Sequence, residues 1–137
     1  MPTATIHEDR FGGIGRRYGT SGLDLLRNSR MAVIGIGGVG SWAAEALARS
    51  GVGTIILMDL DDLCITNTTR QIHALASTIG QSKTEAMAAR IREINPEAEI
   101  ISLNSFYTAS NAEKLLETKP DVIIDAIDSL APKAHLI

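Results

Sequence analysis

A glycine-rich turn between residues 35 and 40 carries the clearest chemical signal in the chain. Its sequence, Gly-Ile-Gly-Gly-Val-Gly, fits the spacing Gly-x-Gly-x-x-Gly and follows a continuous apolar run. Glycines at this spacing let the backbone approach a phosphate chain, and the helix that follows offers unpaired N–H groups and a partial positive charge. The turn alone is typical of many nucleotide-binding proteins, dehydrogenases included. The candidate phosphate-binding residues are Gly35, Gly37, Gly38 and Gly40.

Polar residues after the turn favour ATP over a redox cofactor. Asp59 follows the second apolar run, where a carboxylate can bind ribose hydroxyls in an ATP site or in a dehydrogenase. Asp61 is a further candidate nucleotide ligand, whereas we interpret Asp62 as a solvated turn residue. The guanidinium of Arg70 can grip phosphates through paired hydrogen bonds. Asn67 could either pin the loop or touch the γ-phosphate.

Two charged residues further along complete a candidate site for ATP and Mg²⁺. Lys83 opens a helix that the capping box of residues 82–85 predicts, so a phosphate there would meet both the ammonium group and the helix dipole. Asp128 lies just past the last apolar run, and its hard oxygen ligands suit a Mg²⁺ ion that bridges a triphosphate. Asp128 could instead cap the helix that begins near Pro132. We therefore take Arg70, Lys83 and Asp128 as the candidate catalytic residues, with Asp128 as the metal ligand.

The pattern of apolar residues predicts the elements that position these groups. We expect strands at 31–36, 54–59, 98–103 and 122–125, and helices at 22–28, at 39–50, between Ser82 and Asn95, and from a second capping box at 110–113 to about residue 117. Residues 1–21 are polar and glycine-rich, so we expect an arm there. Strands that alternate with helices predict an α/β, Rossmann-like, doubly wound and mainly parallel sheet in the order 3-2-1-4. We expect one domain, 1–137, with the arm and short helix in 1–29 and the core in 30–137.

The composition indicates a soluble α/β protein with one core. The chain has 137 residues, of which 45% are hydrophobic and 21% charged, and its net charge of −3 provides no basic footprint for nucleic acid. No apolar run approaches the roughly 20 residues of a membrane span, and no signal peptide is evident, so we expect a cytoplasmic protein without stable membrane insertion. The single cysteine, Cys64, excludes an internal disulfide framework. Residues 134–137 form an apolar end without a cap, from which we expect a fragment of a longer protein.

The motifs together resemble the adenylation domain of the ubiquitin-activating-enzyme-like superfamily, of the ThiF, MoeB and HesA type. The residues that carry the resemblance are Gly35–Gly40, Asp59, Asp61, Asn67, Arg70, Gln71, Lys83, Asp125 and Asp128. Segments 10–13, 40–47 and 70–75 are similar to the tRNA threonylcarbamoyladenosine dehydratase branch of that superfamily. The resemblance covers nearly the whole chain.

This resemblance implies an activity, cofactors and partners. The family binds ATP with Mg²⁺ and adenylates a carboxylate. In the dehydratase branch that carboxylate belongs to the threonylcarbamoyl group of a tRNA adenosine, and ring closure then expels AMP. By position, Asp59 would bind the ribose, Arg70 and Lys83 the triphosphate, and Asp128 the Mg²⁺, with Asn67 supporting the phosphate side. The family is usually homodimeric, and sulfur-transfer proteins are possible partners.

The sequence departs from the family pattern in two places. The superfamily often lends an N-terminal arginine to the partner subunit's ATP, but the matching position here is Gly13, so Arg10, Arg16 or Arg17 would have to replace it. Relatives that form thioesters use a cysteine beyond residue 137, and we interpret Cys64 as a packed loop residue rather than that nucleophile.

Several alternatives stay open from the sequence alone. Within the superfamily, the substrate could be the C-terminal glycine of a small sulfur-carrier protein. Outside it, the turn could serve an NAD-binding dehydrogenase, a regulatory nucleotide sensor or a non-catalytic, dimerising fragment. Neither the histidines nor Trp42 suggest a functional role; Trp42 is interpreted as a packing or interface residue.

Overall fold

The structure, a computed structural model, describes residues 3–128 and 130–137. The helices are α1 (Thr3–Arg27), α2 (Gly40–Arg49), α3 (Lys83–Ile94), α4 (Ala112–Glu117) and α5 (Leu130–Leu136), with 3₁₀ turns η1 (Ile65–Thr69) and η2 (Ala109–Asn111). The strands are β1 (Arg30–Ile34), β2 (Thr54–Met58), β3 (Glu99–Leu103) and β4 (Val122–Asp125). All the expected strands are present, and their ends differ from the predicted ones by at most two residues.

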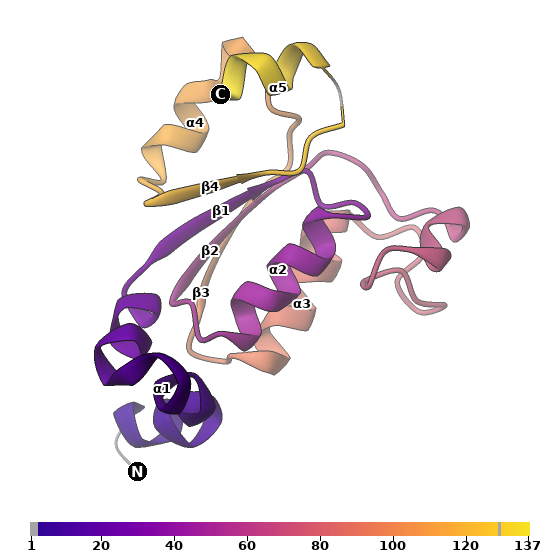
Figure 1. Cartoon of the computed structure of the whole chain (residues 1–137). Helices are drawn as coiled ribbons and strands as arrows, with labels where there is room; N and C mark the ends of the chain where they lie inside the picture. Colours follow the sequence, from indigo (N-terminus) through magenta and orange to yellow (C-terminus); the bar gives the residue numbers. More distant parts are fainter. Residues whose placement is uncertain (1–2, 129) are drawn as a thin grey trace.

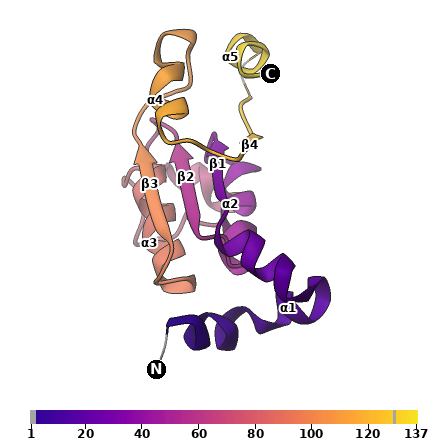
Figure 2. The ribbon, with the colours of Figure 1, turned by 90° about the vertical axis from the view of Figure 1, so that its left-hand side faces the viewer.

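The sheet is parallel throughout and its strands run in the order β3-β2-β1-β4 (Figures 1 and 2), as the sequence predicts. The two central strands read as continuous apolar runs because both of their faces are covered. Val33 and Leu57 point into a cluster with α2 and α3, whereas Ile34 and Met58 point into a second cluster with Leu115 of α4. The result is a three-layer α/β/α arrangement that exposes the carboxyl ends of all four strands at one edge.

Residues 3–21 belong to helix α1, so the prediction of a polar, glycine-rich arm is wrong for the part of it that the structure describes. Helix α1 includes Gly19, whose φ of 83° and ψ of 163° divide it into two segments at a kink. Glycines lower helix propensity, but docking against the rest of the chain overrides that preference. Phe11 is 4% exposed and packs on Gly51, and Arg10 donates a hydrogen bond to the carbonyl of Ile94.

Helix α1 lies at the amino ends of the strands, at the opposite end of the sheet from the glycine turn (Figure 1). The backbone of its last residue, Arg27, touches Gly53 just before β2, where a Cβ would lie 1.7 Å from the Arg27 carbonyl oxygen. A side chain at residue 53 would therefore push α1 away from the sheet.

Of the capping box predicted at residues 82–85, the structure shows the half in which Ser82 accepts a bond, and no return bond from the Glu85 side chain among the described residues. The Ser82 hydroxyl accepts a hydrogen bond from the Glu85 N–H at 3.3 Å and so opens α3. The box predicted at residues 110–113 is wrong, because the box lies two residues earlier, at 108–111: Asn111 Oδ1 accepts from the Thr108 N–H at 2.8 Å. None of the helices in the described ranges combines the length and the apolar character that a membrane crossing requires.

Candidate nucleotide-binding site

A cavity of about 930 Å³ opens at the carboxyl ends of β1, β2 and β4. The residues that line it are Ile34, Gly35, Gly37–Val39, Met58, Asp59, Asp61, Asn67, Arg70, Gln71, Lys83, Phe106–Thr108 and Ala126–Asp128. Every candidate residue from the sequence lies here except Gly40, which is buried beneath the turn. The carboxyl edge of a parallel sheet, beside the strand where the order reverses, is where such folds bind ligands.

The candidate glycines differ in what a side chain at each position would meet. A Cβ on Gly40 would lie 1.6 Å from the Gly35 carbonyl oxygen, and one on Gly35, whose φ is 90°, would lie 2.7 Å from the Ala126 carbonyl oxygen. These two positions are closed to any side chain because backbone packs directly on backbone. At Gly37 the nearest atom to a Cβ would be Gln71 Nε2 at 3.8 Å, so that glycine is needed to leave room above the turn rather than to fold it.

Asp59 and His73 clamp the glycine turn from two sides. Asp59 Oδ2 accepts the Ile36 N–H at 2.7 Å, and its Oδ1 accepts the Asp61 N–H at 2.9 Å. His73 Nε2 lies 3.0 Å from the Ile36 carbonyl oxygen and must carry the proton, since that oxygen can only accept. Both polar groups of residue 36 are thereby fixed by side chains that are 7% and 1% exposed. The turn is preformed before any ligand arrives.

Asn67 pins the loop that carries Arg70. Its Oδ1 accepts from the Cys64 N–H at 2.8 Å, and its carbonyl accepts from the Arg70 N–H at 3.2 Å. The first of the two roles considered for Asn67 is thus present in the structure. Cys64 itself is exposed, so the interpretation of this residue as packed is wrong. It begins the η1 turn, where its backbone N–H donates to Asn67.

Arg70 and Lys83 bring two positive charges to the cavity from different elements. Lys83 is 8% exposed at the first position of α3, and its N–H donates to the Asp61 carbonyl at 3.0 Å. The Arg70 guanidinium is exposed, and the aliphatic part of its side chain passes over Gly38. Neither cation forms an ion pair within the described ranges, which leaves both available to an anionic ligand.

Two aspartates lie at and just after the end of β4, and they differ in whether their side chains have partners. Asp125 Oδ2 lies 3.0 Å from Lys133 Nζ, and its Oδ1 accepts from the Ile127 N–H at 3.1 Å. Asp128 is exposed on the cavity wall and has no hydrogen-bond partner in the part of the chain that the structure describes. No group of three or more His, Cys, Asp or Glu side chains among those residues is arranged to hold a metal ion by itself. The Asp61 carboxylate, on the same cavity wall, also lacks a side-chain partner among the described residues, and this supply of carboxylates fits a Mg²⁺ ion, which commonly takes one or two of them and completes its shell with phosphates and water.

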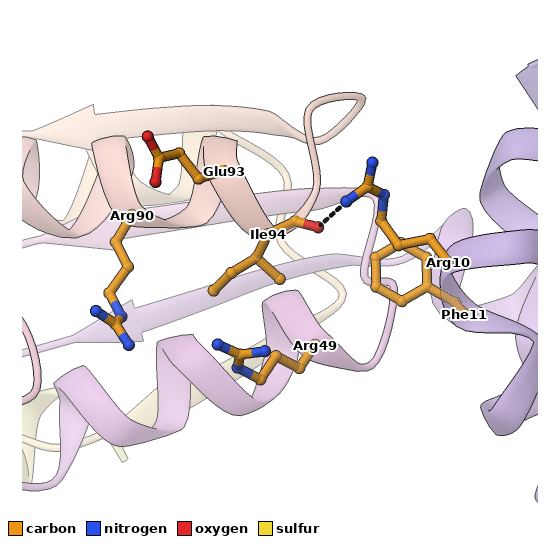
Figure 3. Close-up of a pocket in the computed structure, with 6 residues that line it drawn as sticks. All are labelled: Arg10, Phe11, Arg49, Arg90, Glu93 and Ile94. Carbon is orange, nitrogen blue, oxygen red and sulfur yellow. Dashed lines mark hydrogen bonds between the residues drawn. The ribbon is translucent and has the colours of Figure 1, made fainter.

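A second cavity, of about 420 Å³, holds one of the N-terminal arginines (Figure 3). Arg10 lines this cavity together with Arg49 and Arg90, which bind the Glu45 carboxylate at 2.8 and 2.6 Å respectively. Burial raises the pKa of Glu45, but the hydrogen bonds from Arg90 and Arg49 outweigh it and hold the pKa below its usual value. Because Arg10, Arg16 and Arg17 all belong to α1, they lie at the opposite end of the sheet from this chain's nucleotide cavity.

The ThiF family matches residues 14–137. The chain belongs to the ThiF family. tRNA threonylcarbamoyladenosine dehydratase of Escherichia coli (strain K12) is 53% identical to this ThiF-family chain over 128 residues, which make up 93% of the chain and 48% of that protein.

Solved structures and more distant relatives agree with this assignment. A crystal structure of the E. coli dehydratase TcdA in complex with ATP matches the chain with a TM-score of 0.93 at 52% identity, over 95% of the chain and 54% of that protein. The sulfur carrier protein ThiS adenylyltransferase of E. coli (strain K12) is 33% identical over 115 residues, 84% of the chain and 45% of that protein. The chain spans about half the length of the curated relatives it matches.

The ThiF-family site contains residues to which the sequence analysis gave no role. His73 holds the turn, Trp42 donates from Nε1 to the Arg70 carbonyl at 2.9 Å, and Gln71 is 6% exposed on the cavity wall. Tyr107 also lines the cavity, and its hydroxyl lies 2.7 Å from His135 Nδ1 of α5. These contacts join segments far apart in the chain, and no local pattern in the sequence signals them.

We expect His73 to make the stability of this chain dependent on pH. Burial lowers its pKa from 6.5 to about 4, with Lys83 adding to the effect and the bond to Ile36 opposing it. Because the pKa of His73 is lower in the folded chain, acidification protonates the histidine of the unfolded chain first. The free energy of unfolding is therefore full above pH 6.5 and falls as the pH drops toward 4. We expect unfolding in urea to show a loss of about 2–3 kcal/mol at pH 4.5 relative to pH 7.5 from this residue.

The matched variant is His73→Gln, whose amide can reach the Ile36 carbonyl but does not titrate. We expect this variant to lose about 2–3 kcal/mol less in its free energy of unfolding between pH 7.5 and pH 4.5 than the wild type does. An unchanged slope between pH 7.5 and 4.5 would show that His73 is not the titrating group.

Proposed function

We propose that this chain binds ATP with Mg²⁺ and adenylates the carboxylate of threonylcarbamoyladenosine in tRNA. The observation that supports this most is the meeting of the glycine turn, Asp59, Arg70, Lys83 and Asp128 in one cavity. A dehydrogenase needs a ribose-binding carboxylate but no pair of free cations beside the turn. The identity to a dehydratase, 53% against 33% for the ThiS adenylyltransferase, favours the tRNA substrate over a sulfur carrier.

The proposed chemistry makes an unreactive carboxylate electrophilic. A carboxylate is a poor electrophile until one of its oxygens attacks the α-phosphorus of ATP and the bond to the β-phosphate oxygen breaks, which releases pyrophosphate. An atom of the same threonylcarbamoyl group then attacks the activated acyl carbon. This closes a ring, breaks the acyl–phosphate bond and releases AMP. Negative charge builds on the departing pyrophosphate, and Arg70 and Lys83 are placed to neutralise it.

The remaining residues position the nucleotide. Asp59 uses one lone pair of each oxygen on backbone N–H groups, which leaves acceptor sites for the ribose hydroxyls. Gly37 and Gly38 leave open backbone for the phosphates. Asp128 would hold Mg²⁺, which supplies charge neutralisation across the triphosphate when it is bound.

The proposal extends to partners and location. A homodimer would allow Arg10, Arg16 or Arg17 of one subunit to approach the ATP of the other, since α1 is too far from the site of its own chain. We also propose a cytoplasmic location, where tRNA is modified, and contact with sulfur-transfer proteins.

Calorimetric titration of the purified chain with ATP·Mg²⁺ and separately with NAD tests the proposal. We expect ATP to bind in a Mg²⁺-dependent way and Arg70→Ala to weaken binding about 10- to 100-fold, because a guanidinium forms charge-assisted hydrogen bonds with phosphate. Arg92→Ala, which removes an exposed arginine of α3 outside the cavity, should bind as the wild type does. Tight NAD binding that ignores Arg70 would overturn the proposal.

A further inference from the structure

Trp42 combines high exposure with a specific hydrogen bond. It is the only tryptophan of the chain and is 52% exposed at the third position of α2. Its Nε1–H donates to the carbonyl oxygen of Arg70 at 2.9 Å, across 28 residues of sequence. A tryptophan left half in solvent adds little to the core, so burial does not account for its place on this helix.

The contact bears on Arg70 because little else fixes that residue. The Arg70 side chain has no carboxylate partner within the described ranges, and its Nη1 lies 3.5 Å from the Thr66 carbonyl, at the outer limit of a hydrogen bond. Its backbone is held on one side by Asn67 and on the other by Trp42. Without Trp42, the end of the η1 turn would lose one of the two bonds that fix the direction in which Arg70 leaves it.

The hydrogen bond also joins the two parts of the site that would hold phosphates. Helix α2 grows directly out of the glycine turn, so a bond from Trp42 to Arg70 ties the loop to the turn. Three residues on, His73 ties the same segment to Ile36. Segment 70–73 is thereby fixed to the glycine turn at both ends.

We propose that Trp42 is a positioning residue, which holds Arg70 ready for the phosphates of the nucleotide. This inference rests on the proposed function, since it concerns ATP in the same cavity. A preformed Arg70 avoids part of the ordering cost that a free loop would pay on binding. Trp42 acts through Arg70 alone, so its effect should vanish when the guanidinium is gone.

A double-mutant cycle with Trp42→Phe and Arg70→Ala tests this directly, because phenylalanine keeps the ring and removes the N–H donor. We expect Trp42→Phe to weaken ATP·Mg²⁺ binding about three- to tenfold, because Arg70 must then be ordered on binding, and to change the melting temperature little, because the lost bond is exposed. In the Arg70→Ala background the same change should have no further effect on binding. Equal losses in both backgrounds would overturn the positioning role.

Tryptophan fluorescence provides a second readout that a purely structural contact would not move. Because Trp42 is the sole tryptophan, its emission should change as ATP·Mg²⁺ saturates the wild-type chain and should stay constant when Arg70→Ala is titrated to saturation, at the higher concentrations that its weaker binding requires. Wild-type binding with an unaffected Trp42→Phe variant would remove the positioning role and leave the proposed function standing. Absence of ATP binding by the wild type would overturn both.

Discussion

Gly40→Ala should unfold the chain or destabilise it by about 4 kcal/mol or more, whereas Gly37→Ala should leave its stability unchanged. The new Cβ at residue 40 would lie 1.6 Å from the Gly35 carbonyl oxygen, and backbone cannot move aside there without breaking the turn. At residue 37 the nearest atom is 3.8 Å away and belongs to a side chain. The measurement is urea unfolding of both variants beside the wild type.

The two variants should lose ATP·Mg²⁺ binding for different reasons. Gly37→Ala places a methyl group on the open side of the turn, where phosphates would approach, and should weaken ATP·Mg²⁺ binding at least about tenfold in a fully folded chain. Gly40→Ala should lose binding only through loss of structure. If Gly37→Ala bound ATP as the wild type does, the phosphates would not pass over that side of the turn.

The sheet could be predicted from sequence because its signal is local and strong. Each central strand is a continuous apolar run, and the rule of right-handed crossovers leaves few orders for four strands joined through helices. The strand ends then bring Asp59 and Asp128 to one edge without any further information. The candidate site followed because its residues sit where strands end and helices begin.

What sequence could not predict depends on contacts between distant segments. The helical form of residues 3–21 rests on Phe11 packing against Gly51, which no local propensity encodes. The roles of Trp42 and His73 rest on bonds to backbone carbonyls 28 and 37 residues away. A carbonyl is present at every position, so residue types do not reveal which one a side chain will find.

Lys83→Met should raise the melting temperature while it weakens ATP·Mg²⁺ binding about 10- to 100-fold. Lys83 is 8% exposed as a residue, and its ammonium group has no carboxylate within 4 Å in the described part of the chain, so its burial costs free energy that the fold does not recover. Methionine fills similar space without that cost. The binding loss reflects the missing charge on the phosphate side.

The pKa of His73 offers an independent check on the same variant. Lys83 contributes to lowering that pKa, although burial contributes most, so Lys83→Met should raise it while leaving it below 6.5. NMR titration of the histidine signals measures this, and Lys114→Met, which removes an exposed lysine of α4, is the matched control. Lys83→Met with a lower melting temperature and intact ATP binding would mean that the ammonium group stabilises the fold and does not serve a ligand. A higher melting temperature together with lost binding would instead identify Lys83 as a charge kept for function at the expense of stability.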